Sequence, residues 1–338
     1  MIQEAISKLV QRESLSEHET ESVMNEIMDG KATDAQIAAF LVALRLKGET
    51  IDEITACAKI MRQKAFSIKP KVEFLVDTCG TGGDKCNTFN ISTASAFVAG
   101  GAGASVAKHG NRSVSSKCGS ADVLKELGVN IELQPKQVEK CIEAVGIGFM
   151  FAPVFHPAMK FALAPRREIG IRTVFNILGP LTNPANAKSQ LIGVFDENLM
   201  NGMVNVLKNL GSRHVLAVHS NGMDEISICN KTRVVELKNN NVESYELNPV
   251  DFGFKLASIE DIAGGLPKDN AKIILDVLNG IKGPKRDIVL MNSAAALIAA
   301  ELTKDYKDAL ELAAYSIDSG NALEKLKELV RFTNENAG

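Results

Sequence analysis

The sequence predicts an α/β protein in which a small all-helical N-terminal domain precedes a larger α/β domain with a central, largely parallel sheet flanked by helices. Helix-start signals with helical apolar spacing fill the first 68 residues, and the apolar period changes near residue 70. Beyond that point short apolar runs alternate with helical patterns, which is typical of parallel strands joined by crossover helices. Because 338 residues exceed one average domain, we divide the chain into a helical domain at 1–68 and an α/β domain at 71–338.

The helical domain is predicted from three capping boxes. In each of them a hydroxyl can accept a hydrogen bond from a free backbone amide, and an acid or amide side chain three residues later can reach back. The pairs are Ser16 with Glu19, Thr33 with Gln36, and Thr50 with Glu53. Apolar residues recur at helical spacing behind the second and third pairs. We expect about four helices, whose apolar stripes are also suited to facing a partner chain.

The α/β domain is predicted from short apolar runs that end in glycine-rich or polar loops. The strand candidates are 72–76, 104–107, 148–151, 190–193 and 214–218, with helices expected at 93–99 and 121–127. Ser120 is the expected N-cap of the second of these helices. The proline-rich segment 153–189 is predicted to be a crossover and a hinge, part of which joins the helical domain.

The composition excludes several classes of protein. An apolar share of 45% supplies a sizeable core, and a net charge of −3 argues against a broad nucleic-acid-binding surface. The six cysteines include no C-x-x-C pair, and the first residues lack the apolar core of a signal peptide. We therefore expect reduced thiols in a cytoplasmic protein. No segment has the roughly 20 apolar residues of a membrane span.

Two loops, each after a predicted strand, carry residues suited to holding an anion. The first, at 77–84, supplies Gly82 and Gly83, whose backbone amides can approach a phosphate closely. The start of the following helix attracts negative charge. It adds donors from Asn90, Ser92 and Thr93. Alone, such a glycine loop is a structural turn about as often as a binding site.

The second loop, at 108–116, strengthens this interpretation. It brings cations from Lys108 and Arg112, and hydroxyls from Ser113, Ser115 and Ser116. Ligands of open α/β sheets bind at the carboxyl ends of the strands, where both loops should lie. The first loop matches neither of the common nucleotide-binding fingerprints. We therefore predict a joint anion site in an enzyme that acts on a phosphorylated sugar.

Three charged elements have alternative interpretations. Asp224 and Glu225 are either a solvated turn or magnesium ligands beside a polyphosphate, and Asp84 either shares that ion or braces its own loop. Arg166 is either surface charge or the partner of a substrate carboxylate, which a guanidinium binds through two hydrogen bonds. The role of His109, as a general base or in positioning, stays open. No Ser-His or Cys-His constellation indicates a covalent nucleophile.

Taken together, these motifs resemble the anthranilate phosphoribosyltransferase family over nearly the whole chain. The residues that carry the resemblance are 80–84, 90–93, 108–112, Arg166 with 170–176, 179–184, and Asp224 with Glu225. The resemblance implies transfer of a phosphoribosyl group from phosphoribosyl pyrophosphate to the amine of anthranilate, in tryptophan biosynthesis. It also implies Mg²⁺ as cofactor and a homodimer joined through the helical domain.

The resemblance also implies site residues, to which we add the neighbouring positions of both loops. The donor site would comprise Gly80, Gly82, Gly83, Asp84, Thr88, Asn90, Ile91, Ser92, Thr93, Lys108, His109, Gly110, Asn111, Arg112, Ser113, Ser115, Ser116 and Ser120. Anthranilate would contact Gly80, Asn111 and Arg166, and the metal ions would contact Ser92, Asp224 and Glu225.

Two other functions fit the architecture less well. A pyrimidine nucleoside phosphorylase binds free phosphate and has no need of metal carboxylates for pyrophosphate, so the Asp224–Glu225 pair disfavours it. A non-catalytic relative that binds nucleic acid should have a basic face and eroded donor loops. The estimated isoelectric point of about 6.0 and the intact loops disfavour that function.

Overall fold

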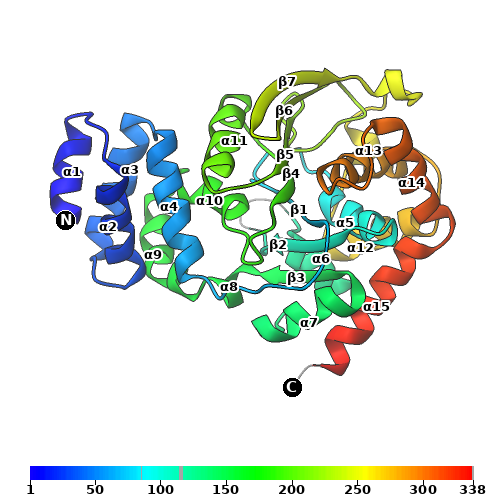
Figure 1. The fold of residues 1–338 in the computed structure, drawn as a ribbon, viewed down its shortest axis with the longest axis horizontal. Helices are drawn as coiled ribbons and strands as arrows, with labels where there is room; N and C mark the ends of the chain where they lie inside the picture. The colour runs from blue at the N-terminus through cyan, green and yellow to red at the C-terminus, as the bar shows by residue number, and fades with distance from the viewer. Residues whose placement is uncertain (85, 114–116, 337–338) are drawn as a thin grey trace.

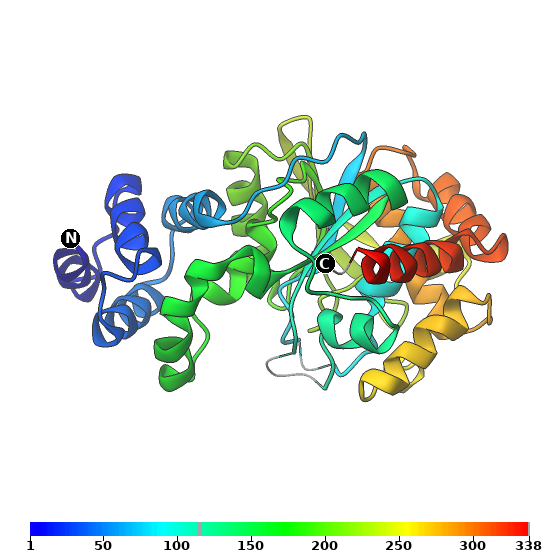
Figure 2. The ribbon, with the colours of Figure 1, turned by 90° about the horizontal axis from the view of Figure 1, so that it is seen from below.

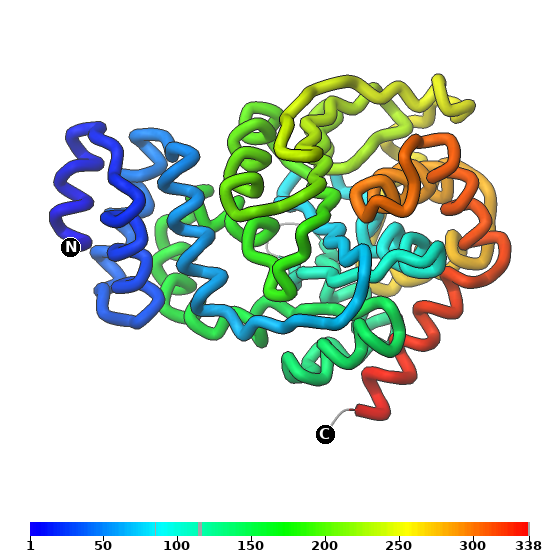
Figure 3. Tube along the Cα trace, viewed as in Figure 1, coloured from blue at the N-terminus to red at the C-terminus, as the bar shows by residue number. Residues whose placement is uncertain are grey.

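The computed structural model describes residues 1–84, 86–113 and 117–336, and it confirms the predicted fold class. A bundle of N-terminal helices lies at one end of a larger α/β body (Figure 1). An extended segment leads from the last of these helices along the body to the first strand (Figure 3). Backbone hydrogen bonds hold this segment, from the Phe66 amide to the Phe155 carbonyl and from the Ile68 amide to the Pro184 carbonyl.

The N-terminal bundle has the four helices that the sequence predicted. They are α1 (Ile2–Val10), α2 (Glu17–Met28), α3 (Asp34–Lys47) and α4 (Ile51–Lys64). All three predicted capping boxes form, with both reciprocal hydrogen bonds present in each. Helix α9 (Lys160–Ile169), from the proline-rich segment, packs against α3 and α2. That segment connects β3 to β4.

The central sheet has seven strands in the order β3-β2-β1-β4-β5-β6-β7. The first five strands in this order are parallel, and β6 and β7 are antiparallel. The strands are β1 (Leu75–Gly80), β2 (Ser105–Gly110), β3 (Ile147–Phe151), β4 (Ser189–Gly193), β5 (His214–His219), β6 (Thr232–Lys238) and β7 (Asn241–Leu247).

Three predicted strand boundaries were wrong by three residues or more. β1 begins at Leu75 instead of residue 72 and continues to Gly80, and β2 continues to Gly110. The ladder explains the difference, because Gly80 pairs with Gly193 and Gly110 pairs with Phe151. The polar ends of both predicted loops are therefore held in the sheet.

The β6–β7 hairpin was missed from the sequence. Its turn residues Asn239 and Asn240 have φ values of 50° and 64°. Two successive positive φ values are typical of the turns that join two-residue hairpins, and Asn tolerates them. The Asn run between two strand-like segments was the available signal.

Helices cover both faces of the sheet, and alternate strand residues enter different cores. Leu216 and Val218 of β5 pack in the core with α5 (Ile91–Gly101), whereas Val215 and Ala217 pack in a core that includes the N-terminal helices. The first core also receives α12 (Pro267–Leu278), α13 (Pro284–Ala299), α14 (Tyr306–Asp318) and α15 (Asn321–Glu335). These helices lie at the end of the molecule away from the N-terminal bundle (Figure 2).

The remaining elements are α6 (Ser120–Glu126), α7 (Pro135–Val145), α8 (Ala152–Phe155), α10 (Phe175–Leu181), α11 (Met200–Asn209), η1 (Pro157–Met159), η2 (Glu197–Leu199), η3 (Pro249–Phe252) and η4 (Glu260–Ile262). Of these, α7 packs against β3, and α11 packs against β5 and β6. None of the six cysteines, all of which lie in the described part of the chain, is in a disulfide. Within the described part of the chain, none of the helices combines the length and apolar character needed to span a membrane.

Candidate active site

The two predicted loops meet at the carboxyl edge of the sheet, where β1 and β2 separate. Their ladder pairs only Leu75 with Ser105 and Val76 with Val106. Beyond these pairs β1 stays with β4 and β2 stays with β3. Ligands of open α/β sheets bind in the crevice outside the carboxyl ends of the strands, where the strand order reverses, and here it reverses between β1 and β4.

The first loop turns through two left-handed glycines. Gly82 and Gly83 have φ values of 64° and 74°, which side-chain-bearing residues rarely adopt. The Arg172 guanidinium donates a hydrogen bond to the Gly83 carbonyl, and a Cβ atom at Gly83 would collide with that guanidinium. Arg172 also stacks on Phe195, 3.8 Å from the ring centroid. Arg172 therefore holds the glycine turn, and the backbone amides of the turn remain at the edge of the sheet.

Asp224 lies against the same turn, in space left by two strand-end glycines. Its Oδ2 accepts a hydrogen bond from the Gly82 amide at 2.8 Å. A Cβ atom at Gly80 would lie 2.8 Å from this oxygen, and one at Gly193 would collide with the Asp224 backbone. Side chains at either position would displace Asp224 from the edge of the sheet.

Three carboxylates crowd this region, and the Lys108 amine is a cation that acts on one of them, Glu225. Burial and repulsion from Asp84 raise the pKa of Asp224 to about 7. Burial and repulsion from Asp224 raise the pKa of Glu225 well above its usual value. One oxygen of Asp84, Oδ2, is buried and accepts no hydrogen bond from the described residues. Crowded oxygens of this kind are suited to a divalent cation.

The described residues do not complete a metal site by themselves. No group of three or more His, Cys, Asp or Glu side chains among them is arranged around one point. Magnesium commonly uses one or two carboxylates and takes its other ligands from substrate phosphates and water. The set therefore fits a cation that is bound together with a phosphorylated substrate.

Glu225 and Ser92 meet at the N-terminus of α5. The Ser92 amide donates to Glu225 Oε1 at 3.1 Å, so this carboxylate satisfies one of the free amides of the helix. The N-cap residue Asn90 makes no side-chain capping bond. Its side chain instead bonds the Cys118 carbonyl and the Asn270 amide. The Asn90 side chain thus ties the start of α5 to the segment before α6 and to α12.

Lys108 brings the only lysine amine within bonding reach of Ser92 among the described residues. Its Nζ donates to the Thr78 carbonyl and to Ser92 Oγ, the latter at 3.2 Å. The side chain is only 3% exposed, and burial lowers its pKa, although Asp77 acts in the opposite direction. A buried amine beside a helix N-terminus is suited to binding a phosphate group.

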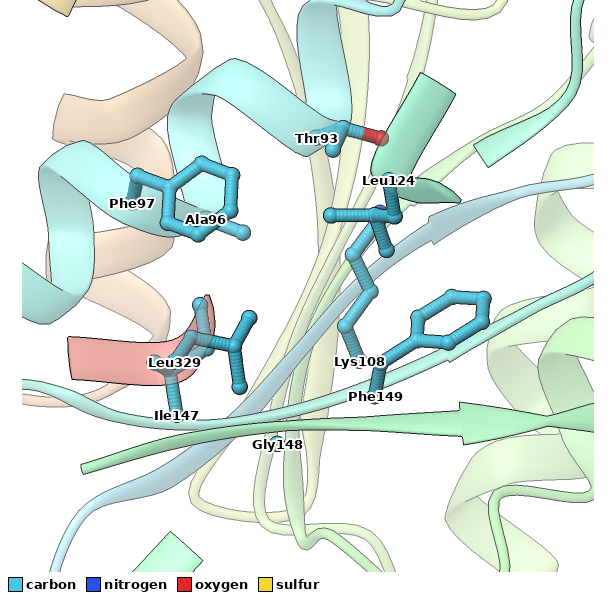
Figure 4. A pocket seen from close by; sticks show the side chains of 9 residues that line it. All are labelled: Thr93, Ala96, Phe97, Lys108, Leu124, Ile147, Gly148, Phe149 and Leu329. Carbon is cyan, nitrogen blue, oxygen red and sulfur yellow. The ribbon is translucent and has the colours of Figure 1, made fainter. Parts of the chain in front are cut away.

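A small cavity lies beside the Lys108 side chain (Figure 4). It is lined by Thr93, Ala96, Phe97, Lys108, Leu124, Ile147, Gly148, Phe149 and Leu329. Its volume of about 10 Å³ is enough for roughly one water molecule. It is therefore a packing defect and not a substrate pocket.

The His109 side chain lies on the side of β2 opposite to the Lys108 side chain. Its imidazole is neutral. Its Nδ1 contacts the Gly179 carbonyl at 3.1 Å, so Nδ1 carries the proton. Nε2 is buried and has no partner among the described residues. Burial and the neighbouring His156, with ring centroids 5.0 Å apart, lower the pKa of His109 to about 3. Burial likewise lowers the pKa of His156 to about 4.

The histidine pair predicts a loss of stability in weak acid. Below the ordinary histidine pKa of 6.5, the unfolded chain binds protons that these folded histidines do not. Stability is therefore lost as the pH falls from 6.5, by about 2 kcal/mol for each histidine at pH 5. Urea unfolding at pH 7.5 and pH 5.0 measures the loss, and His156→Asn should remove about half of the contribution from the pair. An unchanged pH dependence in this variant would contradict the assignment.

The second loop is held by α6. The Asn111 carbonyl accepts the Ala121 amide at 3.1 Å, and Asp122 accepts the Ser113 and Gly119 amides. Because Gly119 is the N-cap, the prediction of Ser120 as N-cap was wrong, and Ser120 is the first helical residue.

The second loop also contains Arg112, Ser115 and Ser116. The Arg112 guanidinium lies 5.7 Å from the Phe151 ring centroid. The predicted site residues Ser115 and Ser116 lie outside the described part of the chain.

Arg166 lies in the last turn of α9, with its guanidinium 5.2 Å from the Phe175 ring centroid. Its side chain is partly buried, burial lowers its pKa, and no described carboxylate forms an ion pair with it. The adjacent Arg167 is exposed. The two arginines therefore differ in burial, and Arg166 is the one suited to a substrate carboxylate.

Two predicted donor-site residues have mainly structural contacts. Ile91 is fully buried in the core, so only its backbone can face a ligand. Thr88 forms a β-bridge with Ala263. The sequence analysis missed Asn270, which is 2% exposed and donates to Asn90 Oδ1 at 2.9 Å. This contact joins residues 180 positions apart, and no local pattern indicates it.

The comparisons with known proteins agree over the whole chain. The protein-family model described as "Glycosyl transferase family, a/b domain" matches residues 73–323. A second family model, described as "Glycosyl transferase family, helical bundle domain", matches residues 3–65. The chain is 59% identical to the anthranilate phosphoribosyltransferase of Acetivibrio thermocellus, over 99% of this chain and 97% of the relative. It is 54% identical to that of Alkaliphilus metalliredigens, over 99% of each.

Solved structures of the same enzyme have the same fold. The Thermus thermophilus enzyme matches with a TM-score of 0.93 at 42% identity, over 98% of this chain and 99% of the other. The Saccharomyces cerevisiae enzyme, solved in complex with PRPP and Mg, matches with a TM-score of 0.90 at 28% identity, over 99% of this chain and 98% of the other.

Proposed function

The chain belongs to the anthranilate phosphoribosyltransferase family, and from that premise we propose which of its residues carry out the reaction. It transfers the 5-phosphoribosyl group of phosphoribosyl pyrophosphate to the amine of anthranilate. The products are N-(5-phosphoribosyl)anthranilate and pyrophosphate, in tryptophan biosynthesis. The observation that carries the assignment of residues is the meeting of glycine amides, a buried lysine and crowded carboxylates at one edge of the sheet.

The donor binds at the ends of β1 and β2. Its diphosphate would replace Asp224 and Glu225 as the acceptor of the Gly82 and Ser92 amides. Lys108 supplies a positive charge beside Ser92. The second loop closes the other side of this site. The full donor set is the one given by the sequence, with Ser115 and Ser116 proposed from the sequence alone.

Magnesium is held by Ser92, Asp224 and Glu225, with Asp84 as a further oxygen donor. The support is the crowding that raises the pKa of Asp224 and the unpartnered Asp84 oxygen. A bound Mg²⁺ would neutralise negative charge on the departing diphosphate. The yeast relative was solved with Mg, which supports the same cofactor here.

The protein's own contribution is positioning and charge stabilisation. Cleavage at the anomeric carbon builds positive charge on the sugar and negative charge on the leaving group, as in glycoside cleavage. Fixed amides and Lys108 stabilise the leaving group without reorganising. Holding the anthranilate amine in line with the breaking bond supplies the remaining rate enhancement. No covalent nucleophile is required.

Anthranilate binds between Gly80, Asn111 and Arg166. Its carboxylate pairs with the Arg166 guanidinium, which has no ion-pair partner among the described residues. A yeast relative was solved with 4-fluoroanthranilate, which supports a site for this aromatic acid. The neutral His109 is close enough in sequence to Asn111 to line the same region, and its role stays open.

The division into domains, the dimer and the compartment are parts of the same proposal. The helical domain comprises 1–68 with part of 153–189, which acts as the hinge, and the α/β domain comprises 71–338. Val10, Leu46 and Ile51 are exposed apolar side chains on the helical domain, and they support a homodimer through it. Six cysteines outside any disulfide, all within the described residues, support the reducing cytoplasm as the compartment.

A fluorescence assay tests the proposed function. When the purified protein is mixed with phosphoribosyl pyrophosphate, anthranilate and Mg²⁺, the fluorescence of anthranilate should decrease and pyrophosphate should be released. A chelator of Mg²⁺ should stop both the fluorescence decrease and the pyrophosphate release. Phosphorolysis of thymidine or uridine without anthranilate turnover would instead indicate the nucleoside phosphorylase. Neither that function nor nucleic-acid binding is favoured by the relatives reported above.

A further inference from the structure

The carboxylate of Asp77 occupies the gap where β1 and β2 separate. Asp77 is the first residue of β1 beyond the ladder with β2, and its exposed fraction is 0%. Its Oδ1 accepts the His109 amide at 3.2 Å. A side chain therefore takes the place of the backbone acceptor that a continuing ladder would supply to this strand.

The other Asp77 oxygen fixes the carboxylate from the opposite side. Oδ2 accepts the Asn183 side-chain amide at 2.7 Å and the Cys79 thiol at 3.1 Å. Asn183 also donates to the Ala107 carbonyl at 2.9 Å. The carboxylate thus joins β1, β2 and the segment after α10 at one buried point. A buried carboxylate with both oxygens satisfied is rigid, whereas an unsatisfied one is costly.

The residue before His109 is the buried Lys108 of the donor site. Asp77 provides the largest favourable charge near that amine, offsetting part of the effect of burial on its pKa. Lys108 and His109 point to opposite sides of β2, so a fixed backbone at His109 determines the direction of both side chains. No contact of Asp77 with the donor is needed for this effect.

We propose that Asp77 is a positioning residue, which holds β1 and β2 apart at the width that the donor requires and fixes Lys108 within reach of Ser92. The inference rests on the proposed donor site at these strand ends. It assigns Asp77 an effect on donor binding beyond its contribution to stability.

Asp77→Asn tests the inference, with Gln190→Leu as the matched control. An Asn side chain would turn its NH₂ toward the Asn183 and Cys79 donors or toward His109, and it removes the charge facing Lys108. Gln190 pairs with Asp77 across β1 and β4, is 3% exposed, and bonds Cys79 and the Pro180 carbonyl. Its replacement disturbs the same buried layer without touching His109 or Lys108.

Titration calorimetry with phosphoribosyl pyrophosphate and Mg²⁺ is the measurement, alongside thermal unfolding of each variant. Asp77→Asn should weaken donor binding about tenfold or more. Gln190→Leu should keep the donor affinity within about twofold of the wild-type value, even if it lowers the melting temperature as much as Asp77→Asn does. Asp77→Ser, whose hydroxyl both donates and accepts hydrogen bonds, should weaken donor binding by the same factor. This variant replaces Asp77→Asn in the test if Asp77→Asn does not fold.

The inference is overturned if donor affinity in the Asp77 variants is unchanged, or if it falls only in proportion to lost stability as in Gln190→Leu. Wild-type protein that does not bind the donor would overturn the proposed donor site and this inference together. Wild-type binding with unaffected Asp77 variants would overturn the inference alone.

Discussion

Replacing Asp224 by Asn together with Glu225 by Gln is expected to lower kcat by about 100- to 1000-fold at saturating Mg²⁺. The two amides keep the shapes of the carboxylates, and their oxygens can still accept the Gly82 and Ser92 amides. What they lose is the charge that binds the cation. The departing diphosphate then lacks its main neutralising partner, so the effect falls on the chemical step.

The same double variant is expected to be at least as stable as the wild type without ligands. In the folded wild type, burial disfavours both charged carboxylates, and repulsion from Asp84 at Asp224 and from Asp224 at Glu225 adds to this effect. Neutral amides remove that repulsion while keeping the hydrogen bonds. Reduced turnover combined with unchanged or raised thermal stability is a signature of a site maintained for function.

Steady-state turnover and thermal unfolding together check this prediction. The matched control is Glu260→Gln with Asp261→Asn, an adjacent and exposed acidic pair on η4. It should turn over at the wild-type rate. Near-normal turnover in the Asp224/Glu225 variant at saturating Mg²⁺ would remove the metal role from this pair.

Arg166→Ala is expected to raise the KM for anthranilate by roughly 10- to 100-fold with little change in the KM for the donor. The size follows from a charge-assisted hydrogen-bond pair worth about 1.5–3 kcal/mol. The guanidinium stacks on Phe175 and forms no ion pair with a described carboxylate, so an external carboxylate is its natural partner.

Arg167→Ala provides the control for Arg166→Ala. The two arginines are adjacent on α9, but Arg167 is exposed whereas Arg166 is partly buried. The Arg167 variant should keep the wild-type KM for both substrates. Equal values in both variants would return Arg166 to the role of a surface charge.

Local chemistry explains why much of the fold was predictable. The capping boxes at Ser16, Thr33 and Thr50 each satisfy amides within one turn, so sequence spacing alone indicates them. The length of β1 was not predictable in the same way. Gly80 continues the strand because Gly193 of β4 lies beside it, and that neighbour is 113 residues away.

In the candidate site, too, some features depend on local sequence and others depend on contacts between distant residues. The glycine turn, Lys108 and the Asp224–Glu225 pair were identifiable from residue type and from position after apolar runs. Their supports were not, because Arg172 reaches Gly83 from a distant segment and Asn270 reaches Asn90 across the core. The burial that raises the pKa of Asp224 also depends on strands that come together only in the folded chain. From the sequence, the acidic pair looked as much like a solvated turn.

A crystal structure of this chain with phosphoribosyl pyrophosphate and Mg²⁺ tests the central claim most directly. The account predicts the diphosphate at the ends of β1 and β2, bonded by the amides of Gly82, Gly83 and the first turn of α5, with the cation between it and the Asp224–Glu225 pair. A diphosphate bound elsewhere, with these amides and Lys108 facing away from it, would contradict the account.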